Sequence, residues 1–390
     1  MVKSLKYGIN IISHICGFPA RERIKRNYCG FLKRHELSGY DFREGVKKYV
    51  SEMKAGTARY LFSKSCNVPT IYSNVYGFLI SEMYSLNDNE ERKAFGEYLD
   101  RHQRGDGLFF DGCYDSRCFF GETGGWGAQH LVPHITVACD RIRKIPRHEF
   151  KYLLPYMNKD YLIKWLDSLD YRNIWASSNH IMNIGVAMQF ARDRMGMPFA
   201  EAVYAMEDYL VKKINKKYGM WYEGEIHNQA QRNEMVRGAY HILPLLYYDK
   251  WDIPYADSAL EQVLAAQNRW GGFDADIGSS ACQDIDGVDP LIRYSMITGI
   301  RDERIISRVR KAKKWILFNQ NEDGGFVFQR SREFKYGGQS TLASRADESN
   351  LFAAWFRSLS LEIIDSFLEN RNSVLIHTPG YECPLRHEIP

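Results

Sequence analysis

The stretch Gln267–Phe328 decides the fold. It reads QNRWGGF at 267–273, ACQDIDGVDPLIRY at 281–294 and KKWILFNQNEDGGF at 313–326. Two loops rich in glutamine, glycine and aromatic residues therefore bracket an acidic cluster at the head of an apolar helix. This order predicts a repeated pair of helices, one inner and one outer. It also predicts polar, reactive side chains at the end of the fold where the inner helices begin, which we call the mouth.

The same pattern recurs along the chain. Six segments of apolar or small residues carry a polar residue near their start, and these positions lie 50 to 63 residues apart: Asn74, Gln129, Asn179, Asn233, Asp284 and Asp347. Such a period suits two helices and two loops. Asparagine and aspartate accept hydrogen bonds from the free amides of a first helical turn, so we expect this column to be the N-caps of the inner helices.

Charged, amphipathic segments alternate with these apolar ones. They predict an outer ring of helices, each with one face exposed to solvent. Glycine-containing loops follow them at 103–109, 217–224, 267–273 and 320–326, where glycine permits a positive φ. The sequence thus predicts an all-α protein, an (α/α)6 toroid of six helix pairs at 57–369. A helical extension at 1–56 and a C-terminal tail at 370–390, expected to strap the surface, complete the chain.

Composition restricts the partners and the setting. The 52 basic and 48 acidic residues are mixed, which argues against nucleic acid. Eight scattered cysteines without a CxxC pair favour a reduced, cytoplasmic protein, and no apolar run is long enough to span a bilayer. The basic N-terminal segment, with Arg21, Arg23, Lys25 and Arg26, has two readings: peripheral contact with an anionic membrane, or docking on the protein's own flank.

The loops QNEDGGF, QNRWGGF and QRGDGLF resemble the QW-type loops of squalene and terpene cyclases. The toroid is likewise similar to that superfamily, which includes the β subunits of protein prenyltransferases. Residues 271–326 resemble the class II cyclase order of GGF, DxDD, inner helix, DER and QW loop. The resemblance implies that Asp286 is the acid that protonates an alkene or epoxide and that Asp284 supports it. Gly287 stands in place of the family's last aspartate, as in single-toroid members with DxDTT.

An acid that protonates a weak base needs a dry site and a second carboxylate nearby, because both favour the protonated form. Asp284, Asp286 and Asp289 supply such a group within two turns. The structural alternative is that Asp284 caps the helix and Asp286 complements its dipole.

Parallel inner helices would gather further side chains at one mouth. The candidate substrate-binding residues are Trp126, His130, His134, His180, Tyr222, Glu234, Arg237, Asp289, Arg345 and Glu348. Helix N-termini at the same rim favour an anionic group on the ligand, such as phosphate or carboxylate. The tryptophan and tyrosine side chains suit a cavity wall and a packed core equally.

Asp111, Cys113 and the more distant His180 resemble the zinc ligands of prenyltransferase β subunits. The motif stands in the early repeats instead of the late ones, so we expect no metal and no cofactor.

Three functions are compatible with these residues. The first is a terpene-cyclase-like enzyme that uses Asp286 on an isoprenoid-type substrate. The second is a carbohydrate-active toroid, a hydrolase, lyase or epimerase of an acidic glycan. The third is a binding toroid without catalysis. A dry aromatic interior would favour the first, an open groove ringed by histidine, glutamate and arginine the second, and a filled centre the third.

Overall fold

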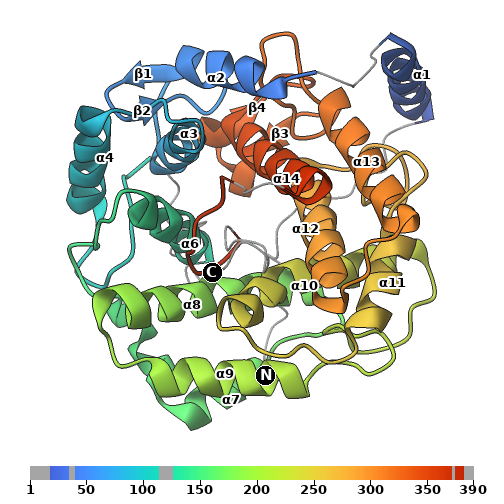
Figure 1. Ribbon diagram of the computed structural model, residues 1–390. Helices are drawn as coiled ribbons and strands as arrows, with labels where there is room; N and C mark the ends of the chain where they lie inside the picture. Colours follow the sequence, from blue (N-terminus) through green and yellow to red (C-terminus); the bar gives the residue numbers. More distant parts are fainter. Residues whose placement is uncertain (1–17, 35–39, 114–125, 371–373, 382–390) are drawn as a thin grey trace.

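Six helices form a closed inner ring in the computed structural model, which describes residues 18–34, 40–113, 126–370 and 374–381 (Figure 1). Each packs against the next in chain order, and the last packs against the first. They are α3 (Ile71–Met83), α6 (Trp126–Arg141), α8 (Ile174–Met195), α10 (Gln229–Tyr248), α12 (Ala281–Thr298) and α14 (Leu351–Glu369).

A second set of helices surrounds this ring. They are α2 (Phe42–Glu52), α4 (Asn89–His102), α7 (Lys159–Asp167), α9 (Ala200–Lys212), α11 (Ala256–Ala266) and α13 (Glu303–Phe318). The small remainder comprises β1 (Lys54–Gly56), β2 (Arg59–Tyr60), β3 (Phe334–Lys335), β4 (Ala343–Ser344) and the 3-10 turns η1 (Lys151–Met157), η2 (Tyr336–Gly338) and η3 (Ser340–Leu342). The predicted all-α toroid is confirmed. The predicted boundaries at 56 and 370 stay predictions, and α2 packs between α3 and α14.

The inner helices begin at other residues than the predicted column. Side chains of Thr70, Asn228, Ser280 and Asn350 accept the first-turn amide hydrogen bonds of their helices. The expectation that the column residues are N-caps is therefore wrong: five lie inside the first two turns, and Asp347 precedes α14. Several are buried and hold neighbouring segments instead, as Asn74 does by accepting the amide of Tyr60 at 2.8 Å.

In three of the loops, one glutamine joins the outer helix that ends there to the next repeat. The side-chain amide of Gln103 donates to the carbonyls of Gly107 and His148. Gln267 donates in the same way to Gly271 and Arg308, and Gln320 to Gly324 and Phe42. One amide thus closes its own loop and binds the neighbouring segment. The bond from Gln320 to Phe42 brings α2 into the ring of outer helices.

Glycines in these loops have the predicted positive φ, with values of 95° at Gly107, 68° at Gly219, 104° at Gly271 and 85° at Gly324. A Cβ atom at any of them would collide with the backbone of the segment packed against the loop, which is the following one for the first three and residue 45 of α2 for Gly324. Glycine is required here both by the dihedral angle and by this close approach.

The N-terminal helix α1 (Phe18–Arg34) docks on the protein's own flank. Tyr28 packs its ring against Trp270, Trp315 and Phe318. Arg21 forms an ion pair with Asp276 at 2.8 Å. Within the described ranges, no helix has the length and apolar character to cross a membrane.

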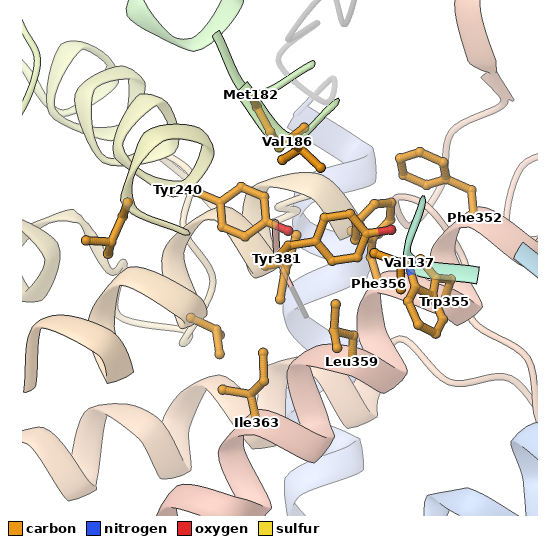
Figure 2. Packing of buried hydrophobic residues seen from close by; sticks show 14 of the residues in the cluster. Val137, Met182, Val186, Tyr240, Phe352, Trp355, Phe356, Leu359, Ile363 and Tyr381 are labelled. Carbon is orange, nitrogen blue, oxygen red and sulfur yellow. The ribbon is translucent and has the colours of Figure 1, made fainter. Parts of the chain in front are cut away.

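The C-terminal tail does not merely strap the surface, as the sequence suggested. Leu375, Thr378 and Tyr381 are buried. Tyr381 lies among side chains of the inner helices, between Tyr240 and Phe356 (Figure 2). A segment without helical periodicity therefore contributes to the interior of the ring.

The first loop offers a matched test of the close approach. Gly107→Ala should lower the free energy of unfolding by about 2 kcal/mol or more, because it adds strain at positive φ and a collision with the backbone at 149–150. Gly105→Ala, in the same loop with open space around it, should change stability by less than about 0.5 kcal/mol. Urea unfolding of both variants checks this, and equal stabilities would contradict the role given to Gly107.

Candidate active site

Asp286 is a buried carboxyl group on the inner face of α12. It is 2% exposed, and its Oδ2 atom has no hydrogen-bond partner among the described residues. Burial raises its pKa well above 3.8, and the charges of Asp289 and Asp284 add to the rise. Arg237 and a hydrogen bond from the Trp175 side chain act in the opposite direction. The balance favours the protonated acid.

Asp286 faces the centre of the ring. It lies one helical turn after Cys282, and residues four apart share a helix face. Burial raises the pKa of Tyr76 on α3, and the charges of nearby groups that include Cys282 raise it further. Because α3 and α12 are not neighbours in the ring, Tyr76 and Cys282 come near each other across its centre. Burial and the charges of Asp289 and Asp286 likewise raise the pKa of Tyr240 on α10.

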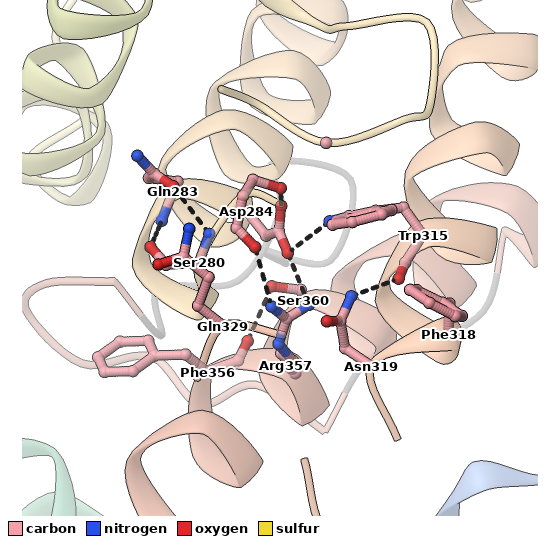
Figure 3. A network of polar contacts seen from close by, with 12 residues as sticks. Ser280, Gln283, Asp284, Trp315, Phe318, Asn319, Gln329, Phe356, Arg357 and Ser360 are labelled. Carbon is pink, nitrogen blue, oxygen red and sulfur yellow. Dashed lines mark hydrogen bonds and ion pairs between the residues drawn. The ribbon is translucent and has the colours of Figure 1, made fainter. Parts of the chain in front are cut away.

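Asp284 points to the other side of α12. Its Oδ2 accepts from Arg357 at 2.6 Å and from the Trp315 indole at 3.1 Å, and its Oδ1 accepts from Ser279 (Figure 3). Residues two apart on a helix do not share a face, so this aspartate cannot line the centre together with Asp286. These contacts hold α12 to α13 and α14, which is a structural role.

Asp289 is also engaged by the protein. Both of its oxygens accept from Nε of Arg293 at 2.9 Å, and both side chains are 0% exposed. Burial raises the pKa of Asp289, while the charge and hydrogen bonds of Arg293 act in the opposite direction, and this pair stands one turn below Asp286.

His130 and His134 lie on α6 among tyrosine side chains. His130 Nδ1 is 2.6 Å from the hydroxyl of Tyr336, and His134 Nδ1 is 2.6 Å from the hydroxyl of Tyr381. Burial lowers the pKa of His134 to about 3 and that of His130 well below 6.5. Both rings are therefore neutral hydrogen-bonding groups near neutral pH, not a cationic site for an anion.

Aromatic rings surround these histidines. Tyr72 and Tyr76 come from α3, Tyr336 from η2, and Phe352 and Phe356 from α14. Their centroids lie 4.8 to 6.1 Å from their neighbours, as in Tyr72 with Tyr336 at 5.1 Å and Phe352 with Phe356 at 4.8 Å. The described side chains around His130 and His134 are thus mainly aromatic.

The N-terminal end of the ring is partly exposed between α6 and α10. Trp126, Trp175, His180 and Glu234 are all half-buried there. Glu234 accepts the backbone amide of Trp175 at 2.9 Å, and burial raises the pKa of its carboxyl group. Burial also lowers the pKa of His180.

Arg237 connects this end to Asp286. Its guanidinium lies 4.9 Å from the centroid of Trp175 and donates to the carbonyl of Phe273 and the carboxylate of Asp274, each at 3.2 Å. These contacts fix the cation beside Asp286, whose pKa burial raises and Arg237 partly lowers.

Several buried polar atoms around the inner ring have no hydrogen-bond partner within the described part of the chain. Apart from Oδ2 of Asp286, they include Asn183 Oδ1, Tyr240 Oη and Arg237 Nε. The helices α8, α10 and α12 supply these four atoms, and α3 and α14 carry further ones, such as Asn74 Nδ2 and Ser358 Oγ. Native interiors rarely leave such atoms unpaired, so the wall that α8, α10 and α12 form suits a polar group of a ligand or a water molecule, as do other parts of the ring.

Three predicted site residues lie away from this wall. Arg345 is exposed, and Glu348 accepts from the amide and hydroxyl of Ser65 and from the amide of Arg345, which orders the loop before α14. Tyr222 belongs to an outer loop and is buried there, with its carbonyl accepting from Asn215.

Of the zinc-like residues, Asp111 has structural partners. Asp111 accepts from the amides of Ile71 and Cys113. No group of three histidine, cysteine, aspartate or glutamate side chains in the described ranges is arranged to hold a metal ion.

Sequence reasoning missed four tyrosines of the interior. Tyr72 and Tyr76 stand four residues apart on one face of α3, and that spacing was available as a signal. Tyr336 and Tyr381 come from segments without helical periodicity, where no pattern marks an inward-facing side chain.

Comparison with known proteins finds similar solved structures but no sequence family. No protein-family model matches the chain, and no curated protein matches its sequence. A polysaccharide lyase is 14% identical, with 85% of this chain and 96% of that chain covered and a TM-score of 0.48. A glycosyl hydrolase of family 88 from Bacteroides vulgatus is 10% identical, with 84% of this chain and 98% of that chain covered and a TM-score of 0.47. The type II terpene cyclase MstE from Scytonema is 11% identical, with 83% of this chain and 97% of that chain covered and a TM-score of 0.45.

The neutral buried histidines make stability depend on pH. Burial lowers the pKa of His241 to about 3 from 6.5, so between these values the unfolded chain binds one more proton than the folded one. Stability is therefore lost as pH falls below about 6.5, by about 1.4 kcal/mol per pH unit for each such histidine. His241→Gln should flatten the dependence measured by urea unfolding between pH 7 and 5.

Exposed His227 supplies the control for that measurement, because His227→Gln should leave the pH dependence of the wild type in place. Identical slopes for wild type and His241→Gln would contradict a neutral, buried His241.

Proposed function

We propose that the protein is an enzyme in which Asp286 is the general acid for an isoprenoid-type substrate. The observation that carries this proposal is the state of that carboxyl group. It is buried, has an unpartnered oxygen and a raised pKa, and stands beside an aromatic interior. A weak base such as an alkene or epoxide needs an acid held protonated in a dry site.

The reaction step follows from this geometry. The O–H bond of Asp286 breaks, and its proton bonds either to an alkene carbon, through the π electron pair, or to an epoxide oxygen, whose C–O bond to the neighbouring carbon then breaks. Either route leaves a carboxylate and a carbocation. Arg237 and the Trp175 side chain, which lower the pKa that burial raises, stabilise that carboxylate. The faces of rings such as Tyr76, Tyr336 and Phe356 stabilise the cation. Loss of a proton from the final cation balances the reaction, which is an isomerisation.

Access is from the partly exposed end at Trp126, Trp175 and His180. Trp126 donates its indole N–H to Asn179 Oδ1 at 2.8 Å, and Asn183 donates to the same oxygen at 3.4 Å. These bonds orient the polar wall of α8 toward an entering ligand. His180 lies at the same end, where no side chain in the described ranges hydrogen bonds to it, so its ring is available to a ligand.

A glycan-acting enzyme is the second candidate, and one observation favours it. Trp175 links two carboxyl groups of raised pKa, since its backbone amide donates to Glu234 and its side chain hydrogen bonds to Asp286. Two carboxyl groups that flank one substrate position are what glycoside hydrolysis requires.

The test is turnover by Asp286→Asn. Purified wild type is incubated with prenyl diphosphates of increasing chain length and, separately, with acidic oligosaccharides, and products are detected by mass spectrometry. Asparagine keeps the shape of the side chain but has no acidic proton, so turnover should fall by about a hundredfold or more while the melting temperature is kept.

Two matched variants separate the alternatives. Asp284→Asn leaves Arg357 buried without its charge partner, so it should cost about 3 kcal/mol of stability and act on turnover only through that loss. Glu234→Gln should spare isoprenoid turnover but stop glycan turnover. A folded, fully active Asp286→Asn protein would remove the acid assignment, and loss of oligosaccharide cleavage in both Asp286→Asn and Glu234→Gln would favour the glycan enzyme.

A further inference from the structure

The C-terminal tail enters the ring from the end opposite the exposed mouth. Arginines at the ends of α6 and α8 hold its backbone: Arg141 donates to the carbonyl of residue 374 at 3.2 Å, and Arg194 to that of His377 at 3.0 Å. The His377 ring stacks on Tyr248 at the end of α10, with centroids 4.9 Å apart. Three inner helices thus direct the tail inward at their C-terminal ends.

Tyr381 is the last described residue of that tail. Its carbonyl accepts from the buried Arg293, at 3.4 Å, and its hydroxyl hydrogen bonds to His134 at 2.6 Å. Its ring lies 6.0 Å from Phe356 and 6.4 Å from Trp355, and it is 1% exposed. Figure 2 shows it among Val186, Tyr240 and Leu359, which come from three different inner helices.

The level of Tyr381 in the ring is set by its partners. His134 and Arg293 both lie further along their helices than the groups at the mouth, and Arg293 also holds Asp289, one turn below Asp286. The tyrosine side chain therefore stands below the candidate acid, on the side away from the mouth. A ligand bound at Asp286 would have this ring on its side away from the mouth.

We propose that Tyr381 is the floor of the ligand site and sets the length of isoprenoid chain that it accepts. This inference rests on the proposed function. The residues around the tyrosine ring are mainly apolar or aromatic, so the space it fills would suit the end of a hydrocarbon chain. Each additional methylene buried there contributes about 0.8 kcal/mol, and the floor decides how many can be buried.

Substitutions at this position separate the ring from its hydroxyl. Tyr381→Ala removes the ring and leaves an apolar space that a longer ligand can fill. Tyr381→Phe removes only the hydrogen bond to His134 and keeps the floor in place. The chain length preferred should therefore change in the first variant and not in the second.

The experiment measures binding in full-length protein that carries Asp286→Asn, which prevents turnover. Quenching of tryptophan fluorescence by geranyl, farnesyl and geranylgeranyl diphosphate gives the affinities. Tyr381→Ala should raise the affinity for geranylgeranyl relative to geranyl diphosphate by about tenfold or more. Tyr381→Phe should change that ratio by less than about twofold. An unchanged ratio in folded Tyr381→Ala overturns the proposal.

Two further measurements keep the test decisive. If Tyr381→Ala does not fold, Tyr381→Leu, which keeps an apolar but shorter side chain, should shift the ratio in the same direction, and no shift overturns the proposal. If no prenyl diphosphate binds protein with Tyr381 intact, the proposed substrate class fails. Xenon NMR then tests the floor itself: a xenon site in Tyr381→Ala and not in wild type supports it, and the absence of one overturns it.

Discussion

The closure of six inner helices into one ring is the constraint on which the rest of the structure depends. Contact between α14 and α3 closes it, and the outer loops hold it through glutamine amides such as that of Gln320, which reaches Phe42 of α2. Because the helices start at one end, groups from distant parts of the sequence meet in the centre. Only this closure brings Tyr336 to His130 and Tyr381 to His134.

The acidic segment of α12 shows how one helix separates structure from chemistry. Asp284 neutralises the buried Arg357 and takes a hydrogen bond from Trp315, so its charge is fully used in packing. Asp286 faces the opposite side, where burial outweighs the opposing effect of Arg237 and keeps the pKa high. A buried carboxyl group that forms no ion pair of its own is costly when ionised, and the protonated form is the physical consequence.

The sequence predicted what local rules determine. The period of the repeats, the glutamine loops and the positive φ of Gly271 follow from patterns within a few residues of one another. The N-caps were misplaced because Asn74 has the chemistry of a cap and is used instead to bind the amide of Tyr60. Glu348 was assigned to the mouth by its register in the repeat, but the loop before α14 departs from that register. Tyr381 was not predicted because a single aromatic residue in an aperiodic tail carries no sign of burial.

The protonation state of Asp286 tests the central claim most directly. Infrared difference spectra of wild type minus Asp286→Asn at pH 7 isolate the C=O stretch of this carboxyl group from other buried acids, such as Glu207, whose pKa burial raises to about 9. The account predicts a protonated-acid band in the difference spectrum, at the frequency of a carboxylic acid in an apolar setting. A difference spectrum that contains only carboxylate bands would contradict it.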